Sequence, residues 1–156
     1  MSIKNNIDNK VVDDFGKEWK AFNHQGLENN DLQSAFDSYF HFFPFANLKD
    51  AEGFDMGCGS GRWAQFVAKK VGFLNCIDPS HLALSQAKLN LVDAANCSLE
   101  CAGVDNNSLK DDSQDFGYSL GVLHHIPDTT LALQSCSKKL KAGAPFLLYL
   151  YYRFDN

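Results

Sequence analysis

Asp55-Met56-Gly57-Cys58-Gly59-Ser60-Gly61-Arg62 is the stretch of this sequence that decides the fold. It follows residues 51–54, which can end a strand, and it precedes residues 63–70, whose apolar side chains have helical spacing. A strand that ends in a glycine-rich turn and continues as a helix directs free backbone N–H groups outward at the positive end of the helix dipole. The stretch therefore predicts a ligand-binding loop.

The spacing of the glycines narrows the class of ligand. The loop reads G-x-G-x-G with Asp55 two residues before the first glycine, whereas dinucleotide-binding loops usually read G-x-G-x-x-G. A carboxylate at Asp55 would suit a ligand with an ammonium group nearby, directly or through water. A purely structural turn is the alternative for this pattern taken alone, so the other motifs of the chain decide between the two.

Asp78 is the second strong feature of the sequence. It ends a mostly apolar, strand-like run over residues 71–77 and is followed by Pro79 and by Ser80, which can cap a helix. Asp78 falls roughly 20 residues beyond the glycine loop, where an acidic side chain at the end of the next parallel strand accepts hydrogen bonds from ribose hydroxyls. A simple turn before Pro79 is the weaker alternative.

Two later stretches complete the pattern. Asp105-Asn106 follows a weaker strand over residues 97–104, and Gly121-Val122-Leu123-His124-His125-Ile126-Pro127-Asp128 follows a strand over residues 116–120. With the glycine loop, these stretches resemble the class I S-adenosylmethionine-dependent methyltransferases, and the loop resembles motif I of that family. An Asx-rich surface turn is the alternative for Asp105-Asn106.

This resemblance implies a cofactor and a set of contacts. The cofactor would be S-adenosyl-L-methionine, with S-adenosyl-L-homocysteine as the product, Asp78 at the ribose and Asp105-Asn106 at the adenine. The implied cofactor-binding residues are Asp55, Gly57, Cys58, Gly59, Gly61, Asp78, Pro79, Asp105, Asn106, Leu120 and Gly121.

The N-terminal region predicts helices in front of this core. Residues 1–9 are polar and are expected to be frayed, whereas the apolar spacing predicts one helix over residues 11–22 and another over residues 32–40. Family members with a similar Phe-Gly-x-x-Trp element use N-terminal helices to cover the cofactor, which implies a lid role for Phe15 and Trp19. Core packing is the alternative for both side chains.

Strands that alternate with helices predict an α/β fold, a Rossmann-like parallel sheet with helices on both faces. The resemblance supplies the strand order 3-2-1-4-5, an N-terminal helical cap over residues 1–48 and a cofactor-binding core over residues 49–156. A ligand is then expected outside the carboxyl ends of strands 1 and 4. The last strand, over residues 144–152, would be an apolar sheet edge.

The family usually continues past this strand with a helix and with strands 6 and 7, which are missing here. The sequence is therefore interpreted as a fragment of a longer reading frame, or else as a protomer that buries the edge of strand 5 in a homo-oligomer.

Composition excludes several classes of protein. The 156 residues and the apolar share of 45% fit one globular domain, and a net charge of −5 without a dense Lys/Arg run argues against a nucleic-acid partner. No stretch is long and apolar enough to span a bilayer, and no apolar signal core begins the chain, so we expect a cytoplasmic protein. Reduced thiols without a disulfide or a zinc site are expected at Cys58, Cys76, Cys97, Cys101 and Cys136.

His124 and His125 are the candidate catalytic residues, since they follow strand 4 where the transferred methyl group is expected to emerge. A general base is needed only if the acceptor arrives protonated, and histidine titrates in the useful range. A packing role for either histidine stays open, and no third ligand suggests a metal site.

The leading hypothesis is methyl transfer to a small-molecule acceptor. A binding or interaction module that keeps the fold without turnover is the alternative, and the loop spacing disfavours a nicotinamide dehydrogenase.

Overall fold

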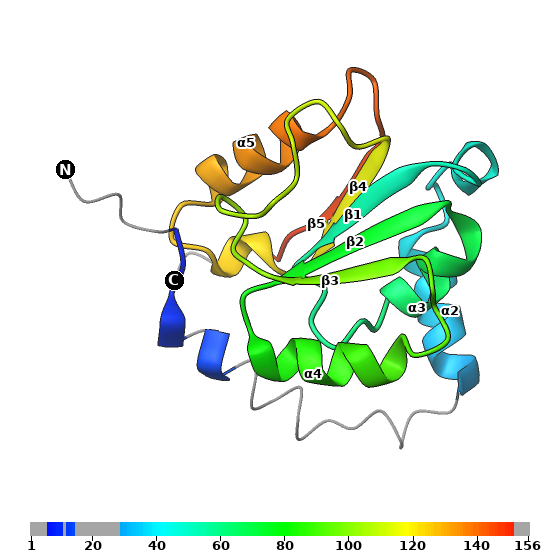
Figure 1. Ribbon diagram of the computed structural model, residues 1–156, viewed down its shortest axis with the longest axis horizontal. Coiled ribbons are helices and arrows are strands. Elements are labelled where there is room, and N and C mark those ends of the chain that lie inside the picture. The colour runs from blue at the N-terminus through cyan, green and yellow to red at the C-terminus, as the bar shows by residue number, and fades with distance from the viewer. Residues whose placement is uncertain (1–5, 11, 15–28, 152–156) are drawn as a thin grey trace.

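The computed structural model describes residues 6–10, 12–14 and 29–151. Five parallel strands form one sheet, shown in Figure 1, in the order β3-β2-β1-β4-β5. The strands are β1 (Glu52–Met56), β2 (Phe73–Asp78), β3 (Cys97–Cys101), β4 (Phe116–Leu120) and β5 (Phe146–Tyr149). This order confirms the one that the resemblance supplied, and it places the switch point of the sheet between β1 and β4.

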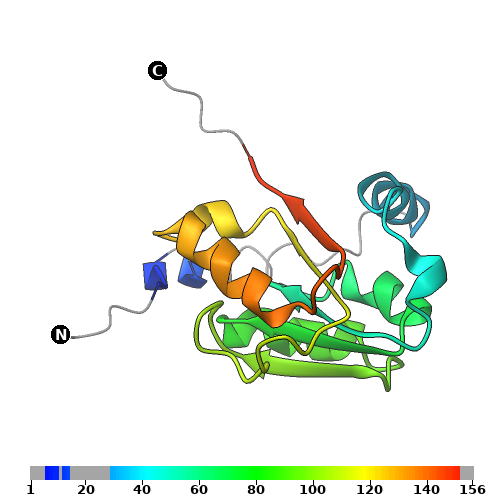
Figure 2. The same ribbon diagram turned by 90° about the horizontal axis from the view of Figure 1, so that it is seen from above.

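Helices cover both faces of the sheet, as expected (Figures 1 and 2). The helices are α2 (Asn29–Tyr39), α3 (Ala64–Val67), α4 (His81–Asn90) and α5 (Thr129–Lys139), and the short 3₁₀ helices are η2 (Phe45–Asn47), η3 (Ala68–Lys70) and η4 (Leu123–His125). Ser80 caps α4 as predicted, because its Oγ accepts a hydrogen bond of 3.3 Å from the Ala83 N–H.

The helix after the glycine loop is shorter than the sequence indicated. The predicted helix over residues 63–70 is α-helical only in α3, which has four residues, and it then tightens into η3. A helix of one turn contributes little dipole, so binding of a ligand at the glycine loop would depend on the backbone geometry of the loop itself.

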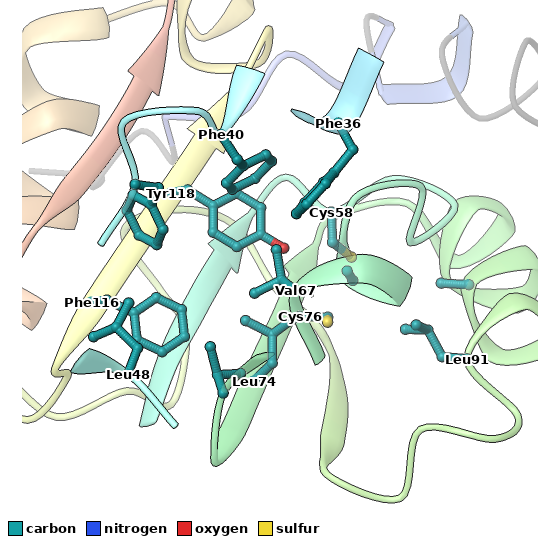
Figure 3. Close-up of a cluster of buried hydrophobic side chains, with 14 of the residues drawn as sticks. Phe36, Phe40, Leu48, Cys58, Val67, Leu74, Cys76, Leu91, Phe116 and Tyr118 are labelled. Carbon is teal, nitrogen blue, oxygen red and sulfur yellow. The ribbon is translucent and has the colours of Figure 1, made fainter. Parts of the chain in front are cut away.

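The hydrophobic core has two layers because successive side chains of a strand point to opposite faces of the sheet. One layer contains Leu74, Cys76 and Tyr118 together with Phe36 and Phe40 of α2 (Figure 3). The other layer lies under α5 and contains Phe54, Met56, Ile77, Val104, Leu123, Ala132, Cys136 and Leu140.

Helix α2 is packed into the first of these layers. The Phe36 and Phe40 rings stack with centroids 4.5 Å apart, and Phe40 meets Tyr118 of β4 edge to face at 5.2 Å. This part of the predicted N-terminal cap therefore shares the core of the sheet, while the boundary between residues 48 and 49 stays a prediction. Of the predicted helix over residues 11–22, only residues 12–14 are described, and these are helical.

The outer edge of β5 pairs with no other strand in the described part of the chain. Its side chains and those that follow are well exposed, with Tyr149 at 38%, Leu150 at 36% and Tyr151 at 58%. None of the described helices is both long and apolar enough to cross a membrane.

Candidate functional site

A cavity of about 300 Å³ lies where the sequence placed the ligand, at the carboxyl ends of β1 and β4. The segments that follow β1, β2 and β4 all contribute to its wall, as expected for the switch point of such a sheet. The predicted residues that line it are Gly57, Cys58, Gly59, Asp78, Pro79, Leu120, Gly121 and His125.

The glycine loop is held in a conformation that only glycine adopts readily at its key positions. Gly57 has φ +80°, and a Cβ added there would lie 2.4 Å from Val122 Cγ1. The N–H groups of Gly57 and Cys58 both donate to the Ile77 carbonyl, at 2.8 and 3.0 Å. The loop is therefore fixed against β2 with its other side open to the cavity.

Gly61 is a predicted binding residue that does not line the cavity. It has φ +74°, and a Cβ added there would lie 3.2 Å from Leu91 Cδ1 at the end of α4. Its position lets the loop approach the helix closely, which is a packing role.

Asp78 connects the glycine loop to the turn after β2. Its Oδ2 accepts a hydrogen bond from the Gly59 N–H and its Oδ1 accepts one from the Ser80 N–H, both at 2.9 Å. Burial raises the pKa of this carboxyl, and the two N–H groups oppose the rise. Each carboxylate oxygen can accept further hydrogen bonds, so Asp78 can serve a ligand while it holds the loop.

Asp55 is buried beneath the loop and does not line the cavity. It lies between Cys76 of β2 and Tyr118 of β4 in the register of the sheet and is 2% exposed. Burial raises the pKa of Asp55 to about 8, although the nearby Tyr118 hydroxyl opposes the rise. Asp55 Oδ2 and Tyr118 Oη lack a hydrogen-bond partner of ordinary geometry. At neutral pH Asp55 is therefore mostly a protonated acid.

The predicted adenine residues lie beside the cavity, not in its wall. Asp105 Oδ2 accepts a hydrogen bond of 3.3 Å from the Asn6 N–H, and Asn106 Oδ1 accepts one of 2.6 Å from the Gly103 N–H. Gly103 and the adjacent Val104 line the cavity instead. Asp105 and Asn106 thus fix the conformation of the turn whose backbone lines the cavity.

The two candidate catalytic histidines differ in position. His125 lines the cavity, whereas His124 is packed against the Tyr151 ring at 4.9 Å, and neither of its ring nitrogens has a hydrogen-bond partner. Partial burial lowers the pKa of both histidines, and His125 lowers that of His124 further. Both imidazoles are therefore mainly neutral at pH 7.

A buried asparagine near the N-terminus contradicts the expected fraying for residues 6–9, while residues 1–5 lie outside the described residues. Asn6 is 6% exposed, and it exchanges two hydrogen bonds of 2.9 Å with the backbone of Asp128. Asn6, Ile7 and Asp8 line the cavity, so this segment closes one side of it. The proposed lid residues Phe15 and Trp19 lie outside the described residues.

An aromatic wall, which the sequence did not reveal, forms another side of the cavity. It consists of Arg62, Trp63, Tyr39, Tyr149 and Tyr151, all of which line the cavity. Arg62 and Trp63 directly follow Gly61 in the sequence, so their position beside the cavity could have been predicted. The tyrosines come from α2 and from the end of β5, and no local pattern brings these segments together. In the described part of the chain, no group of three or more His, Cys, Asp or Glu side chains could hold a metal ion.

Known proteins resemble this chain in sequence. It is 32% identical over 111 residues to the tRNA U34 carboxymethyltransferase of Aliarcobacter butzleri, a match that covers 67% of this chain and 35% of that protein. It is 28% identical over 101 residues to the ubiquinone biosynthesis O-methyltransferase of Paracidovorax citrulli, covering 63% of this chain and 42% of that protein. The matches thus span less than half of the length of these two curated relatives.

Solved structures share the fold. An S-adenosylmethionine-dependent methyltransferase from Mesorhizobium loti matches with a TM-score of 0.65 and 23% identity, over 75% of this chain and 54% of that one. Phosphoethanolamine N-methyltransferase 1 of Haemonchus contortus, solved with phosphoethanolamine and S-adenosylhomocysteine, matches with a TM-score of 0.66 and 15% identity, over 90% of this chain and 32% of that one. The methyltransferase domain family itself matches residues 54–148, from β1 to β5. On that match, this chain belongs to the methyltransferase domain family.

Proposed function

We propose that the cavity binds S-adenosyl-L-methionine and that the protein transfers the methyl group to a small-molecule acceptor, leaving S-adenosyl-L-homocysteine. The observation that supports this most is the Asp78 carboxylate, which bonds to the Gly59 N–H of the glycine loop and at the same time lines the cavity. This arrangement joins the backbone loop to an acceptor for ribose hydroxyls at the switch point of the sheet.

The residues present fit the cofactor. A Cβ at Gly57 would collide with Val122, so glycine is needed there for the loop backbone to line the cavity beside Val122. Gly103 and Val104 offer a backbone and apolar surface for a flat base. Asp105 and Asn106 would act on this surface through the turn that they hold. A lid role for Phe15 and Trp19 remains part of the proposal.

When bound, the cofactor supplies a methyl group that is already activated as a sulfonium. Positioning and exclusion of water are then the main tasks of the protein. His125 lines the cavity as a mainly neutral imidazole, so it can accept the proton of a hydroxyl acceptor. His124 would support the His125 ring, since the two ring centroids lie 4.0 Å apart.

Calorimetric titration with S-adenosyl-L-homocysteine tests the binding part of the proposal. We expect micromolar affinity for this ligand and much weaker binding of NAD. Asp78→Ala should weaken the binding by about ten-fold or more, since hydrogen bonds to a charged group are the stronger kind. Asp115→Ala is the matched control, because Asp115 also accepts a backbone N–H bond, from Glu52 at 2.9 Å, but far from the cavity. A folded sample that does not bind S-adenosyl-L-homocysteine would contradict the proposal.

A binding or interaction module that keeps the fold without turnover is the second candidate. Incubation of the protein with methyl-labelled cofactor and a cell extract separates the two candidates. A labelled small molecule in the extract supports the transferase, while cofactor binding without any labelled product supports the module.

We also infer that the open edge of β5 can pair with a second copy of the chain. Exposed strand edges with apolar side chains favour such pairing, and Leu150 next to β5 is 36% exposed. Light scattering at several protein concentrations should show a dimer, and a monomer at every concentration would oppose this inference.

A further inference from the structure

The aromatic wall of the cavity is continuous from the glycine loop to the end of β5. The Arg62 guanidinium carbon lies 4.6 Å from the centroid of the Trp63 ring, and the Trp63 and Tyr39 centroids are 5.3 Å apart. Tyr39 meets Tyr149 edge to face at 5.1 Å, and Tyr149 meets Tyr151 in the same way at 5.1 Å. These contacts hold four rings and one cation along a single side of the cavity.

The cation in this wall, Arg62, forms no ion pair with any carboxylate of the described residues. Arg62 Nε is buried without a hydrogen-bond partner. Within the described residues both ion pairs are made by lysines, Lys139 with Asp111 and Lys141 with Asp115, so no carboxylate there neutralises Arg62. A buried donor on a charged group is costly to leave unsatisfied, and a ligand carboxylate would satisfy it in the geometry that guanidinium favours.

Two carboxylates, Asp78 and Asp8, also line the cavity, and backbone N–H groups bond to both. Asp78 is held by the N–H groups of Gly59 and Ser80, and Asp8 Oδ1 accepts a hydrogen bond from the Lys10 N–H. The lowered pKa of His125 keeps that side chain mainly neutral at pH 7. Among the described residues that line the cavity, Arg62 is the one Lys or Arg, and it belongs to the aromatic wall, so a carboxylate is favoured over an amine next to Arg62.

We propose that this wall is an acceptor subsite for a planar carboxylate, whose carboxylate is held by Arg62 and whose ring packs against Tyr39, Tyr149 and Tyr151. The inference rests on the proposed function, and it names the class of acceptor for that cavity. It distinguishes an aromatic acid from the amine acceptors that the same fold could also take.

Calorimetry on protein saturated with S-adenosyl-L-homocysteine tests the subsite. The probes are benzoate, cyclohexanecarboxylate and benzylamine, and we expect benzoate to bind most tightly and benzylamine not to bind. Arg62→Gln should weaken benzoate binding by about ten-fold or more. Lys69→Gln is the matched control, because Lys69 lies 5.9 Å from the Phe66 ring centroid and does not line the cavity. Tyr151→Leu, at a well exposed position, should weaken benzoate more than cyclohexanecarboxylate.

A second titration tests whether Arg62 binds the carboxylate of the acceptor or that of the cofactor, because the amino-acid part of the cofactor also carries a carboxylate. S-Adenosyl-L-homocysteine is compared with 5′-methylthioadenosine, which lacks that part, on the wild-type protein and on Arg62→Gln. If each ligand binds equally well to the wild-type protein and to Arg62→Gln, Arg62 does not contact the cofactor. This result supports the proposal that Arg62 holds the acceptor. Selective weakening of S-adenosyl-L-homocysteine in Arg62→Gln assigns Arg62 to the cofactor and overturns it.

Two further outcomes are separable. Failure of benzoate to bind the loaded wild-type protein, or equal binding of benzoate to Arg62→Gln, overturns the acceptor subsite alone. Failure of folded wild-type protein to bind S-adenosyl-L-homocysteine contradicts the proposed function instead.

Discussion

The two ends of the sheet differ in how far the polar side chains there are hydrogen-bonded within the protein. Toward the amino ends of the strands, Asn75 Nδ2 donates to Glu52 Oε1 at 3.0 Å and to Gln114 Oε1 at 3.1 Å, and Ser98 Oγ donates to Asn75 Oδ1 at 2.9 Å. Toward the carboxyl ends, Asp78 has hydrogen-bond partners, but several other buried polar atoms lack them. In the described residues these atoms are Asp55 Oδ2, Ser60 Oγ, Arg62 Nε, Tyr118 Oη, and both ring nitrogens of His124.

This difference separates stability from binding. A polar group that is satisfied within the protein adds to the folded state, while one that is buried without a partner costs free energy until a ligand or water satisfies it. All the unpartnered atoms belong to β1, β4 or the segments that follow them, which border the cavity. We therefore expect substitutions at the carboxyl ends to change ligand affinity, and substitutions at the amino ends to change only stability.

The largest effect is expected at Gly57. Gly57→Ala places a methyl group 2.4 Å from Val122 Cγ1 at φ +80°, so the loop must move and the affinity for S-adenosyl-L-homocysteine should fall by about a hundred-fold or more. Gly143→Ala is a close control, because Gly143 has φ +81° but no atom within 4 Å of the added Cβ. It should cost about 1 kcal/mol of stability through backbone strain and leave the affinity unchanged. Equal affinities of the two variants would contradict the assignment of the loop.

Gly57 and Asp78 also show what a sequence can reveal. Both belong to local patterns, a glycine-rich turn after a strand and an acid at the end of the next strand, and parallel strands bring such turns to one edge of the sheet. The strand order and the position of the cavity followed from these patterns with the family resemblance. Where the structure departs from the prediction locally, as in α3, the helical turn tightens into η3 after four residues.

The features that could not be predicted depend on contacts between distant segments. Asn6 bonds to Asp128, 122 positions away, and nothing in its polar neighbourhood signals burial. Tyr39 and Tyr149 belong to elements whose own patterns indicate core packing, and they meet only when α2 lies against the end of β5. The pKa of Asp55 is raised by burial between Cys76 and Tyr118, and strand register cannot be read from the loop motif.

At Asp55 we expect the stability of the fold to depend on pH. Burial raises the pKa of Asp55 from 3.8 to about 8. At pH values between these two, Asp55 is protonated in the folded protein and ionised in the unfolded chain. The wild-type protein should therefore lose stability relative to Asp55→Asn as the pH rises from 4 to 8, by at most about 1.4 kcal/mol per pH unit. Urea unfolding of both proteins at several pH values measures the difference. A difference that does not vary with pH would show that Asp55 titrates normally in the fold.

At the amino ends the expected change is smaller and of another kind. Asn75→Ala removes the amide that joins Glu52, Gln114 and Ser98, so it should lower the free energy of unfolding by about 1–3 kcal/mol. The affinity for S-adenosyl-L-homocysteine, measured well below the unfolding temperature, should equal that of the wild-type protein. A clear loss of affinity would mean that the two ends of the sheet are coupled and that the comparison fails.

The smallest effect is expected for the ion pair between Lys141 and Asp115, at the same end as Asn75. Its N–O distance is 2.6 Å, and the hydrogen bond from Lys141 lowers the pKa of Asp115. The pair therefore stabilises the fold at pH values above the pKa of an unfolded aspartate, and this stabilisation is lost in acid. Since the Lys141 side chain is 52% exposed, solvent screens the interaction, and Lys141→Gln should cost about half a kcal/mol or less. Urea unfolding at low and at high salt separates the charge from packing, because only the charge contribution disappears at high salt. A cost that persists in high salt would place Lys141 among the packed side chains of this end, and the backbone bond from Glu52 to Asp115 would then hold the strand without help from the charge.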